Sequence, residues 1–422
     1  MGSMLLELPT IQHWSCHQCA GCCRQHIIEI TEEEKQRIES QGWKAADGVP
    51  DDRPLVVWFA GPIWRKRYRL AHRDDGACVF LDERGLCRIH GKFGEVAKPL
   101  ACRLYPYSFH PHGKKVAISL RFSCPSVVAN RGEPVTQQEA TLRALAACVV
   151  PEQSQRILPP PVVGKQRVAW ELFDLLLSPC DQWLKSERHP LLLRLARCLG
   201  YAHMLSQTNL HGVTWHQAQG FVETLQQYVE TELNQIPTLP PPSATARMYF
   251  RLQVAPLIRR DTFAREQRGF LHRWRSLLTI VRLTRGRGII WPFVSGLQPV
   301  SCELLEQPVG PWPDSIPPLF TRYLRIKFAG MHFCGRAFYD WSLVDGLQAL
   351  VLMVPAVCWL ARWYARSAGR DYYQETDFLQ ALALADHHYG YHPALGRYDS
   401  LFRLRWLAEQ GELLRVVNWY TQ

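Results

Sequence analysis

Apolar side chains recur at intervals of three and four residues through most of the chain after residue 165. The interval is clear at Trp170, Phe173 and Leu176, and it returns in residues 191–199 and 221–228. Such spacing places apolar groups on one face of a helix. The same pattern predicts helices at 319–333, 341–366, 373–388 and 400–420. We therefore expect a large α-helical domain in the second part of the chain.

Shorter elements are predicted in the first part of the chain. Alternating runs at 27–30, 65–70 and 118–124 indicate β-strands. Thr31, followed three residues later by Glu34, has the form of a capping box that begins a helix. This mixture predicts a small α+β module before the helical domain.

Three consecutive prolines, Pro159 to Pro161, separate the two patterns. Proline interrupts helices and sheets, so we place a domain boundary near residue 155. The predicted fold is mainly α. A small cysteine-rich α+β module occupies residues 1–155, and a large α-helical domain occupies residues 156–422.

Composition agrees with a folded protein of two or more domains, because 47% of the 422 residues are hydrophobic and 21% are charged. The longest uncharged run, 346–361, contains Pro355 and is followed by Arg362. It is short for a membrane span, so we expect a buried core helix there and no membrane span. No basic stretch precedes an apolar run near the N-terminus, and we expect a cytoplasmic protein.

Cysteine is concentrated near the N-terminus. The box Cys16-His17-Gln18-Cys19-Ala20-Gly21-Cys22-Cys23 has a CxxCxxCC spacing, which curls the backbone so that sulfurs converge. In a reducing cytoplasm such thiols bind metals more often than they form disulfides. The candidate metal ligands are Cys16, Cys19, Cys22, Cys23, Cys78, Cys87, Cys102 and Cys124. The six later cysteines lack ligand spacing, and we expect them to be small buried hydrophobic residues.

Two further expectations concern how the thiols are arranged. Cys22 and Cys23 are adjacent, and neighbouring side chains normally diverge, so we expect them to bind different metal atoms or to have different roles. A turn at 82–85 is expected to bring Cys78 and Cys87 together. Closely spaced cysteines serve both zinc and iron–sulfur sites, so the spacing leaves both open.

These cysteine motifs resemble a known family. The CxxCxxCC box, the Cys-x-Phe-Leu run at 78–81 with Cys-x-Ile at 87–89, and the Pro-x-x-Cys-Arg-x-Tyr-Pro run at 99–106 are similar to the bacterial cysteine-cluster family of zinc- or iron-chelating proteins. The Ser-Cys-Pro run at 123–125 and the long helical part resemble the larger flagellin lysine N-methylases. Lys98 stands where the family usually has arginine, and the box is shorter than in the methylases.

The resemblance implies a metal-binding protein whose cofactor is an iron–sulfur cluster, expected to be of the 4Fe–4S type, with zinc as the alternative. It also implies an enzyme that uses S-adenosylmethionine to methylate a protein or peptide. The sequence shows no Walker loop, GxGxxG, HExxH or GxSxG motif, so it identifies no catalytic residue and no residue that binds S-adenosylmethionine. The alternative function is a zinc-stapled, non-enzymatic scaffold protein that binds through an arginine-rich helical surface.

An arginine-rich segment accounts for much of the net charge of +11. Residues 247–287 contain eleven arginines and two carboxylates, and helical spacing predicts one ridge of Arg251, Arg259, Arg268, Arg275 and Arg282. The simplest interpretation is the solvent face of an amphipathic helix. The functional hypothesis is a surface for an acidic protein or peptide partner, and nucleic acid is the less favoured partner.

Three histidines, His387, His388 and His392, suggest a second metal site. They lie near a predicted helix C-terminus, where histidine also interacts favourably with the helix dipole. We favour the structural interpretation.

Overall fold

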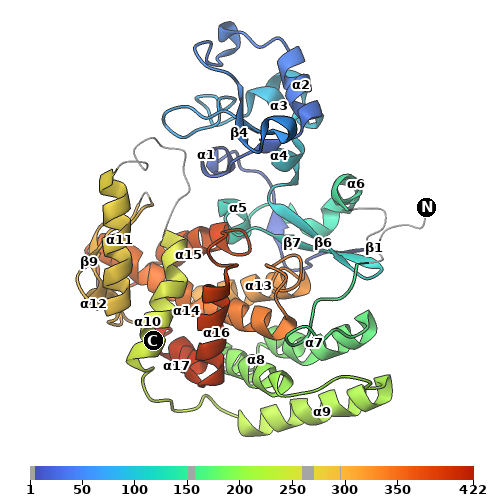
Figure 1. The fold of residues 1–422 in the computed structure, drawn as a ribbon, viewed down its shortest axis with the longest axis vertical. Helices are drawn as coiled ribbons and strands as arrows, with labels where there is room; N and C mark the ends of the chain where they lie inside the picture. Colours follow the sequence, from blue (N-terminus) through green and yellow to red (C-terminus); the bar gives the residue numbers. More distant parts are fainter. Residues whose placement is uncertain (1–4, 151–156, 259–269, 295) are drawn as a thin grey trace.

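The computed structural model describes residues 5–150, 157–258, 270–294 and 296–422. Two lobes are visible in Figure 1. The N-terminal lobe carries β4 and α2 to α4 at one end of the molecule, and the helices of the second part of the chain form the larger body. The described part of the chain is mainly α, with an α+β N-terminal part.

The N-terminal lobe is built on a three-stranded antiparallel sheet. Its strands are β3 (Glu29–Ile30), β5 (Arg67–Leu70) and β4 (Val56–Ala60), in that order. Around it lie α1 (Gly21–Gln25), α2 (Glu32–Ser40), α3 (Arg88–Phe93) and α4 (Leu100–Leu104). The predicted capping box is confirmed: the Thr31 hydroxyl accepts from the Glu34 N–H, and the Glu34 carboxylate accepts from the Thr31 N–H.

A second sheet connects this lobe to the helices. The parallel strand β1 (Leu5–Glu7) and the antiparallel strand β6 (Tyr107–His112) flank β7 (Lys115–Leu120). A short pair, β2 (His13–Trp14) and β8 (Glu133–Pro134), lies beside α5 (Pro125–Val128), and α6 (Glu139–Val149) follows. The strand expected at 118–124 therefore starts earlier and ends at Leu120.

The helical body contains the helices that the apolar periodicity predicts, together with α10, α11 and the short α12. They are α7 (Trp170–Lys185), α8 (Leu191–Ser206), α9 (Trp215–Glu232), α10 (Ala244–Val254), α11 (Phe270–Arg285), α12 (Cys302–Leu305), α13 (Ile316–Ala329), α14 (Leu343–Ser367), α15 (Glu375–His388), α16 (Tyr398–Glu409) and α17 (Glu412–Tyr420). A small antiparallel pair, β9 (Ile289–Ile290) and β10 (Val300–Ser301), follows α11. Residues 400–420, expected to form one helix, form α16 and α17, which are separated at Gly411 with a φ of 66°.

Helix α14 is the centre of the helical body. By length and hydropathy it could cross a membrane, but 94% of its most apolar window is buried inside the protein. The helix packs against α15, α17 and α8, so every side of it faces protein. The expected core helix at 346–361 is confirmed.

The hydrophobic cores do not divide at the domain boundary predicted near residue 155. One small core, which includes Ile28, Ile38, Phe80 and Ile89, belongs to the N-terminal lobe alone. Residues 107–135 contribute instead to the large core of the helical body. The boundary near residue 155 stays a prediction, but β6, β7 and α5 pack with the helices.

A buried ion pair lies where the second sheet meets the helices. The Lys327 Nζ atom is 2.7 Å from an Asp386 carboxylate oxygen, and both side chains are fully buried. The other carboxylate oxygen accepts from the Ser123 N–H at 3.1 Å, and Lys327 also donates to His332 Nδ1 at 3.2 Å. Because α13, α15 and the segment after β7 all contribute, the pair joins the N-terminal part of the chain to the body.

We expect this junction to make folding stability fall in acid. Burial, with a smaller contribution from the Lys327 charge, lowers the pKa of His110 to about 3, whereas an unfolded histidine has a pKa of about 6.5. The folded state binds fewer protons between these values, so the contribution present above pH 6.5 is lost as the pH falls towards 3. His110→Gln should remove up to about 1.4 kcal/mol per pH unit of that dependence. Urea unfolding at several pH values between the two pKa values measures it.

The exposed His216 of α9 is the matched control. His216→Gln should retain the pH dependence of the wild-type protein. An unchanged pH dependence in His110→Gln would show that the acid sensitivity does not come from this histidine.

Candidate metal centre

The CxxCxxCC box is a tight turn that leads into α1. Gln18 and Ala20 have positive φ angles of 56° and 57°, a region that side chains other than glycine seldom adopt. The helix begins at Gly21 and carries Cys22 and Cys23 in its first turn. Their sulfurs lie 3.9 Å apart, so the expectation that the two adjacent side chains diverge is wrong.

The other three cysteines of the N-terminal lobe approach the same place from two segments. The Cys78 N–H donates to the Cys23 carbonyl at 2.8 Å, which ties the box to residue 78. The turn after Cys78 is held by Asp82, which accepts from two backbone N–H groups, and Leu81 forms an isolated bridge with Cys87. Cys102 comes from α4. Cys23, Cys78, Cys87 and Cys102 pack in the small core of this lobe.

These thiols are close enough to affect one another's protonation. Burial raises the pKa of Cys78 to about 12, and Cys87 and Cys22 add to this. Burial also raises the pKa of Cys102 well above its usual value, with contributions from Cys78, Cys87 and Cys22. The pKa of Cys22 is raised first by its hydrogen bond with Cys23 and then by burial. A bound cation reverses this balance, since it favours the thiolate.

Cys124 lies near enough to Cys19 of the box to be affected by it. Cys124 is buried at the start of α5, and its pKa is raised by burial, with a smaller contribution from Cys19. A Cβ atom on Gly21 would lie 3.5 Å from the Cys19 sulfur and 3.8 Å from Pro125. Gly21 therefore lies close to Cys19 and to the residue that follows Cys124. Cys16 is exposed at the start of the box.

The donor chemistry fits a thiolate-bound metal. The group around Cys22 offers only sulfur, the donor of zinc Cys₄ sites and of iron–sulfur clusters. Tetrahedral zinc, with Zn–S bonds of about 2.3 Å, places its sulfurs about 3.8 Å apart, and the Cys22–Cys23 pair matches that separation. In the described part of the chain, no three His, Cys, Asp or Glu side chains have converged on one ion position.

A comparison with known protein families finds one match, and it covers the cysteine-rich N-terminal region. Residues 15–125 match the family model described as "CxxCxxCC: Putative zinc- or iron-chelating domain". The match covers about a quarter of the chain and includes all eight candidate cysteines. No curated protein and no solved structure matches the chain. The resemblance to the chelating family is thus confirmed over residues 15–125, and the methylase resemblance stays a prediction.

Two cations accompany the thiols of this chelating domain, and the sequence pattern did not identify either of them. Lys98 is close enough to Cys22 and Cys102 to lower both thiol pKa values slightly, and Arg73 does the same for Cys78. Lysine can perform this role where the family usually has arginine, because the interaction is with charge and needs no bidentate geometry. A thiolate site carries excess negative charge, which these cations partly neutralise.

The histidines at the end of α15 lie in a row rather than around one point. The ring centroids of His26 and His387 are 4.9 Å apart, those of His387 and His388 are 4.9 Å apart, and those of His388 and His392 are 5.2 Å apart. Burial, with the charge of Arg121, lowers the pKa of His26 to about 3. Among the described residues these histidines form no group that could hold a metal ion.

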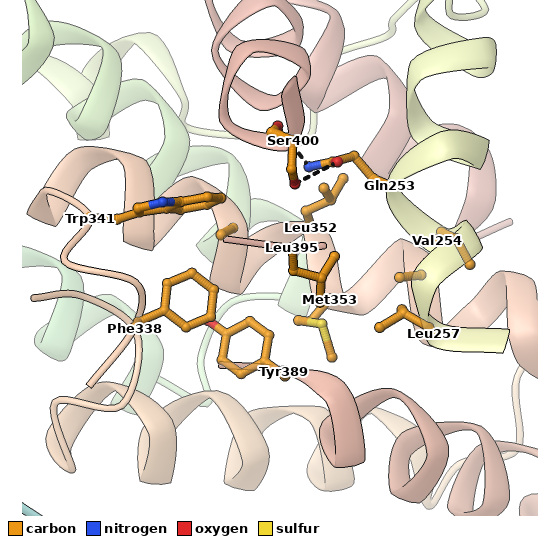
Figure 2. Close-up of a pocket in the computed structure, with 12 residues that line it drawn as sticks. Gln253, Val254, Leu257, Phe338, Trp341, Leu352, Met353, Tyr389, Leu395 and Ser400 are labelled. Atoms are coloured by element: carbon orange, nitrogen blue, oxygen red, sulfur yellow. Dashed lines mark hydrogen bonds between the residues drawn. The ribbon is translucent and has the colours of Figure 1, made fainter. Parts of the chain in front are cut away.

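The pocket detected in the helical body contains none of the candidate cysteines. Figure 2 shows the aromatic side chains of Phe338, Trp341 and Tyr389 facing aliphatic side chains, with a hydrogen-bonded pair of Gln253 and Ser400 at one side. Its volume is about 40 Å³, enough for a few water molecules or one small apolar group.

The six cysteines after residue 124 were expected to be buried. Five of the six are buried, and Cys148 is exposed.

The predicted arginine ridge is not one surface. Arg251 is buried, donates to the Leu283 carbonyl at 2.6 Å and lies 3.1 Å from a Glu306 oxygen. Arg282 is half-buried against the Trp291 ring, whereas Arg275 is exposed. Arg259 and Arg268 lie outside the described residues. The helical spacing failed for Arg251 because a separate helix, α10, carries it into the core.

We therefore expect opposite results at two arginines. Arg251→Gln leaves Glu306 buried without its cation, and breaking a buried pair lowers the free energy of unfolding by about 3–5 kcal/mol. Arg275→Gln changes an exposed side chain and should alter stability by no more than about 0.5 kcal/mol. Urea unfolding of both variants tests this, and an equally small change in both would place Arg251 outside the core.

Proposed function

We propose that residues 15–125 hold an iron–sulfur cluster on cysteine thiolates. The observation that carries the proposal is that Cys22, Cys23, Cys78, Cys87 and Cys102, from the box, the turn and α4, lie in or beside one small core, near enough to affect one another's protonation. The remaining three candidates, Cys16, Cys19 and Cys124, serve as alternative ligands or as a second site. A reducing compartment such as the cytoplasm keeps these thiols available.

Two features favour a cluster over a single ion. Five thiols gather where tetrahedral zinc takes four, and a body of several iron and sulfide atoms spreads its ligands further apart than one ion does. The surrounding side chains include Phe80 and Ile89, which restrict access of water. When bound, a cluster supplies one-electron chemistry, and burial and hydrogen bonds to its sulfurs set its potential.

Zinc is the second candidate, supported by the 3.9 Å separation of the Cys22 and Cys23 sulfurs. In that case the domain is a stapled scaffold, and function belongs to other surfaces. Helix α11 then offers a surface for an acidic protein or peptide, since Arg273, Arg275 and Arg285 are exposed there. Modification of protein side chains with S-adenosylmethionine stays a proposal that rests on resemblance alone.

Metal analysis of protein purified without oxygen distinguishes the two metals. We expect brown protein with iron and acid-labile sulfide, and colourless protein with zinc alone would overturn the cluster. Cys102→Ser should lose most of the bound iron because its thiol lies within the group. Cys148→Ser is the matched control: it should retain the metal, since this exposed thiol lies on α6. Equal metal loss in both variants would contradict the assignment.

Removal of the metal should unfold one lobe only. The metal joins segments on either side of residues 24–77, so its affinity contributes to the folding of that loop. A strong chelator should therefore expose residues 15–104 to proteases. Residues 107–135 should stay protected because they pack in the helical core. Limited proteolysis with mass spectrometry maps the cleavage sites, and full resistance of residues 15–104 after metal removal would mean that the metal is not structural.

A further inference from the structure

The connection between β4 and β5 is an exposed aromatic tip on the N-terminal lobe. Trp64 is 88% exposed and Trp58 is 53% exposed, although tryptophan is usually well buried. Arg65 and Lys66 follow Trp64 directly and are exposed as well. This lobe stands at the end of the molecule away from α9 and α17 (Figure 1).

Backbone constraints hold the tip in one shape. Gly61 has a φ of 85°, and a Cβ atom there would lie 2.1 Å from the Arg65 carbonyl oxygen, so a side chain cannot fit. The register of β4 and β5 shifts between Trp58 and Ala60, and the Trp58 indole donates to the Ala60 carbonyl at 2.8 Å. Residues Ile63–Arg65 form a 3₁₀ turn. The exposed indole of Trp64 is therefore carried by a defined turn.

The segment that carries the tip contains cations only, although carboxylates flank it at Asp52 and Asp74. Residues 53–73 contain six cations and no carboxylate: Arg53, Arg65, Lys66, Arg67, Arg69 and Arg73. Arg53, Arg67 and Arg73 form ion pairs with carboxylates elsewhere in the lobe. Arg65 and Lys66, next to Trp64, are in none of the ion pairs found among the described residues, and Lys66 lies 5.6 Å from the Trp58 ring centre.

We propose that this tip docks on an anionic lipid surface. Tryptophan rings favour the headgroup level of a bilayer, and adjacent basic side chains are attracted to anionic lipids. Bases of single-stranded nucleic acid stack instead on aromatic rings along a basic groove. A side chain that is 88% exposed at the end of a hairpin protrudes, which suits insertion between headgroups better than stacking. The contact is peripheral and differs from a membrane span.

Vesicle binding by the full, metal-loaded protein tests the proposal. We expect cosedimentation with vesicles of phosphatidylcholine and phosphatidylglycerol, little with phosphatidylcholine alone, and release by salt. The double variant Arg65→Gln with Lys66→Gln should bind more weakly by about fivefold for each cation removed. Trp64→Ala should also weaken binding. Brominated lipids should quench fluorescence of the wild-type protein more than that of Trp64→Phe, because the indole enters the headgroup region.

Matched controls keep the test specific. Trp215 of α9 is 52% exposed, and Lys165 and Arg188 are exposed cations of the helical body. Trp215→Ala, and Lys165→Gln with Arg188→Gln, should bind vesicles as the wild-type protein does. Dichroism and metal content confirm that each variant is folded.

Several results would overturn the proposal. These are no binding to either vesicle, equal binding to both, or equal weakening by tip and control substitutions. Binding to single-stranded oligouridylate that the tip variants abolish, with vesicle binding unchanged, would assign the tip to nucleic acid instead.

Discussion

A small hydrophobic core is the constraint on which the N-terminal lobe depends. The core that includes Ile28, Ile38, Phe80 and Ile89 is separate from the helical body. A core of so few side chains supplies little net stability, and a metal or disulfide staple adds to it. The thiols of this lobe are all free, and the group around Cys22 lies within or against that core. The small core that most needs a cross-link is therefore also where the candidate metal ligands lie.

The junction between the lobe and the helical body depends on a buried ion pair rather than on a hydrophobic core. Lys327 and Asp386 form a fully buried ion pair, and such pairs are stable only when their remaining bonds are satisfied. The Ser123 N–H provides one of those bonds. Because Ser123 precedes Cys124, the pair places one thiol next to the body while Cys78 and Cys102 stay in the lobe. The same segment thus links the cysteine motif to the helices.

The candidate metal centre and the proposed docking tip occupy different parts of the N-terminal lobe. The helical body surrounds α14 and gives the N-terminal lobe a fixed base. The lobe holds Cys23, Cys78, Cys87 and Cys102 in or against its small core, whereas its aromatic tip between β4 and β5 is exposed. At Gly61 in the tip, a larger residue would collide with the Arg65 carbonyl oxygen, so this turn admits only glycine. A metal centre and a docking surface can therefore occupy one small lobe without sharing residues.

The sequence by itself determined the local elements and the donor chemistry. Apolar spacing located α7, α8 and α14, and the Thr31–Glu34 capping box located the start of α2, since these signals depend on neighbours within a few residues. The CxxCxxCC spacing likewise identified thiols as the ligand type. The sequence pattern did not predict the break between α16 and α17. This break depends on the backbone conformation of Gly411, which apolar spacing does not indicate.

Only the tertiary structure decided which of those groups meet. Cys23 and Cys78 are joined by a backbone hydrogen bond across residues 24–77, and no local spacing encodes that contact. Cys124, at the start of α5, lies near enough to Cys19 of the box for the two thiols to affect each other's protonation, although more than a hundred residues separate them in sequence. Arg251 faces the core because α10 packs against α11. Its partner carboxylate belongs to Glu306, the residue directly after α12. Contacts between distant segments follow from packing, and packing is a property of the whole chain.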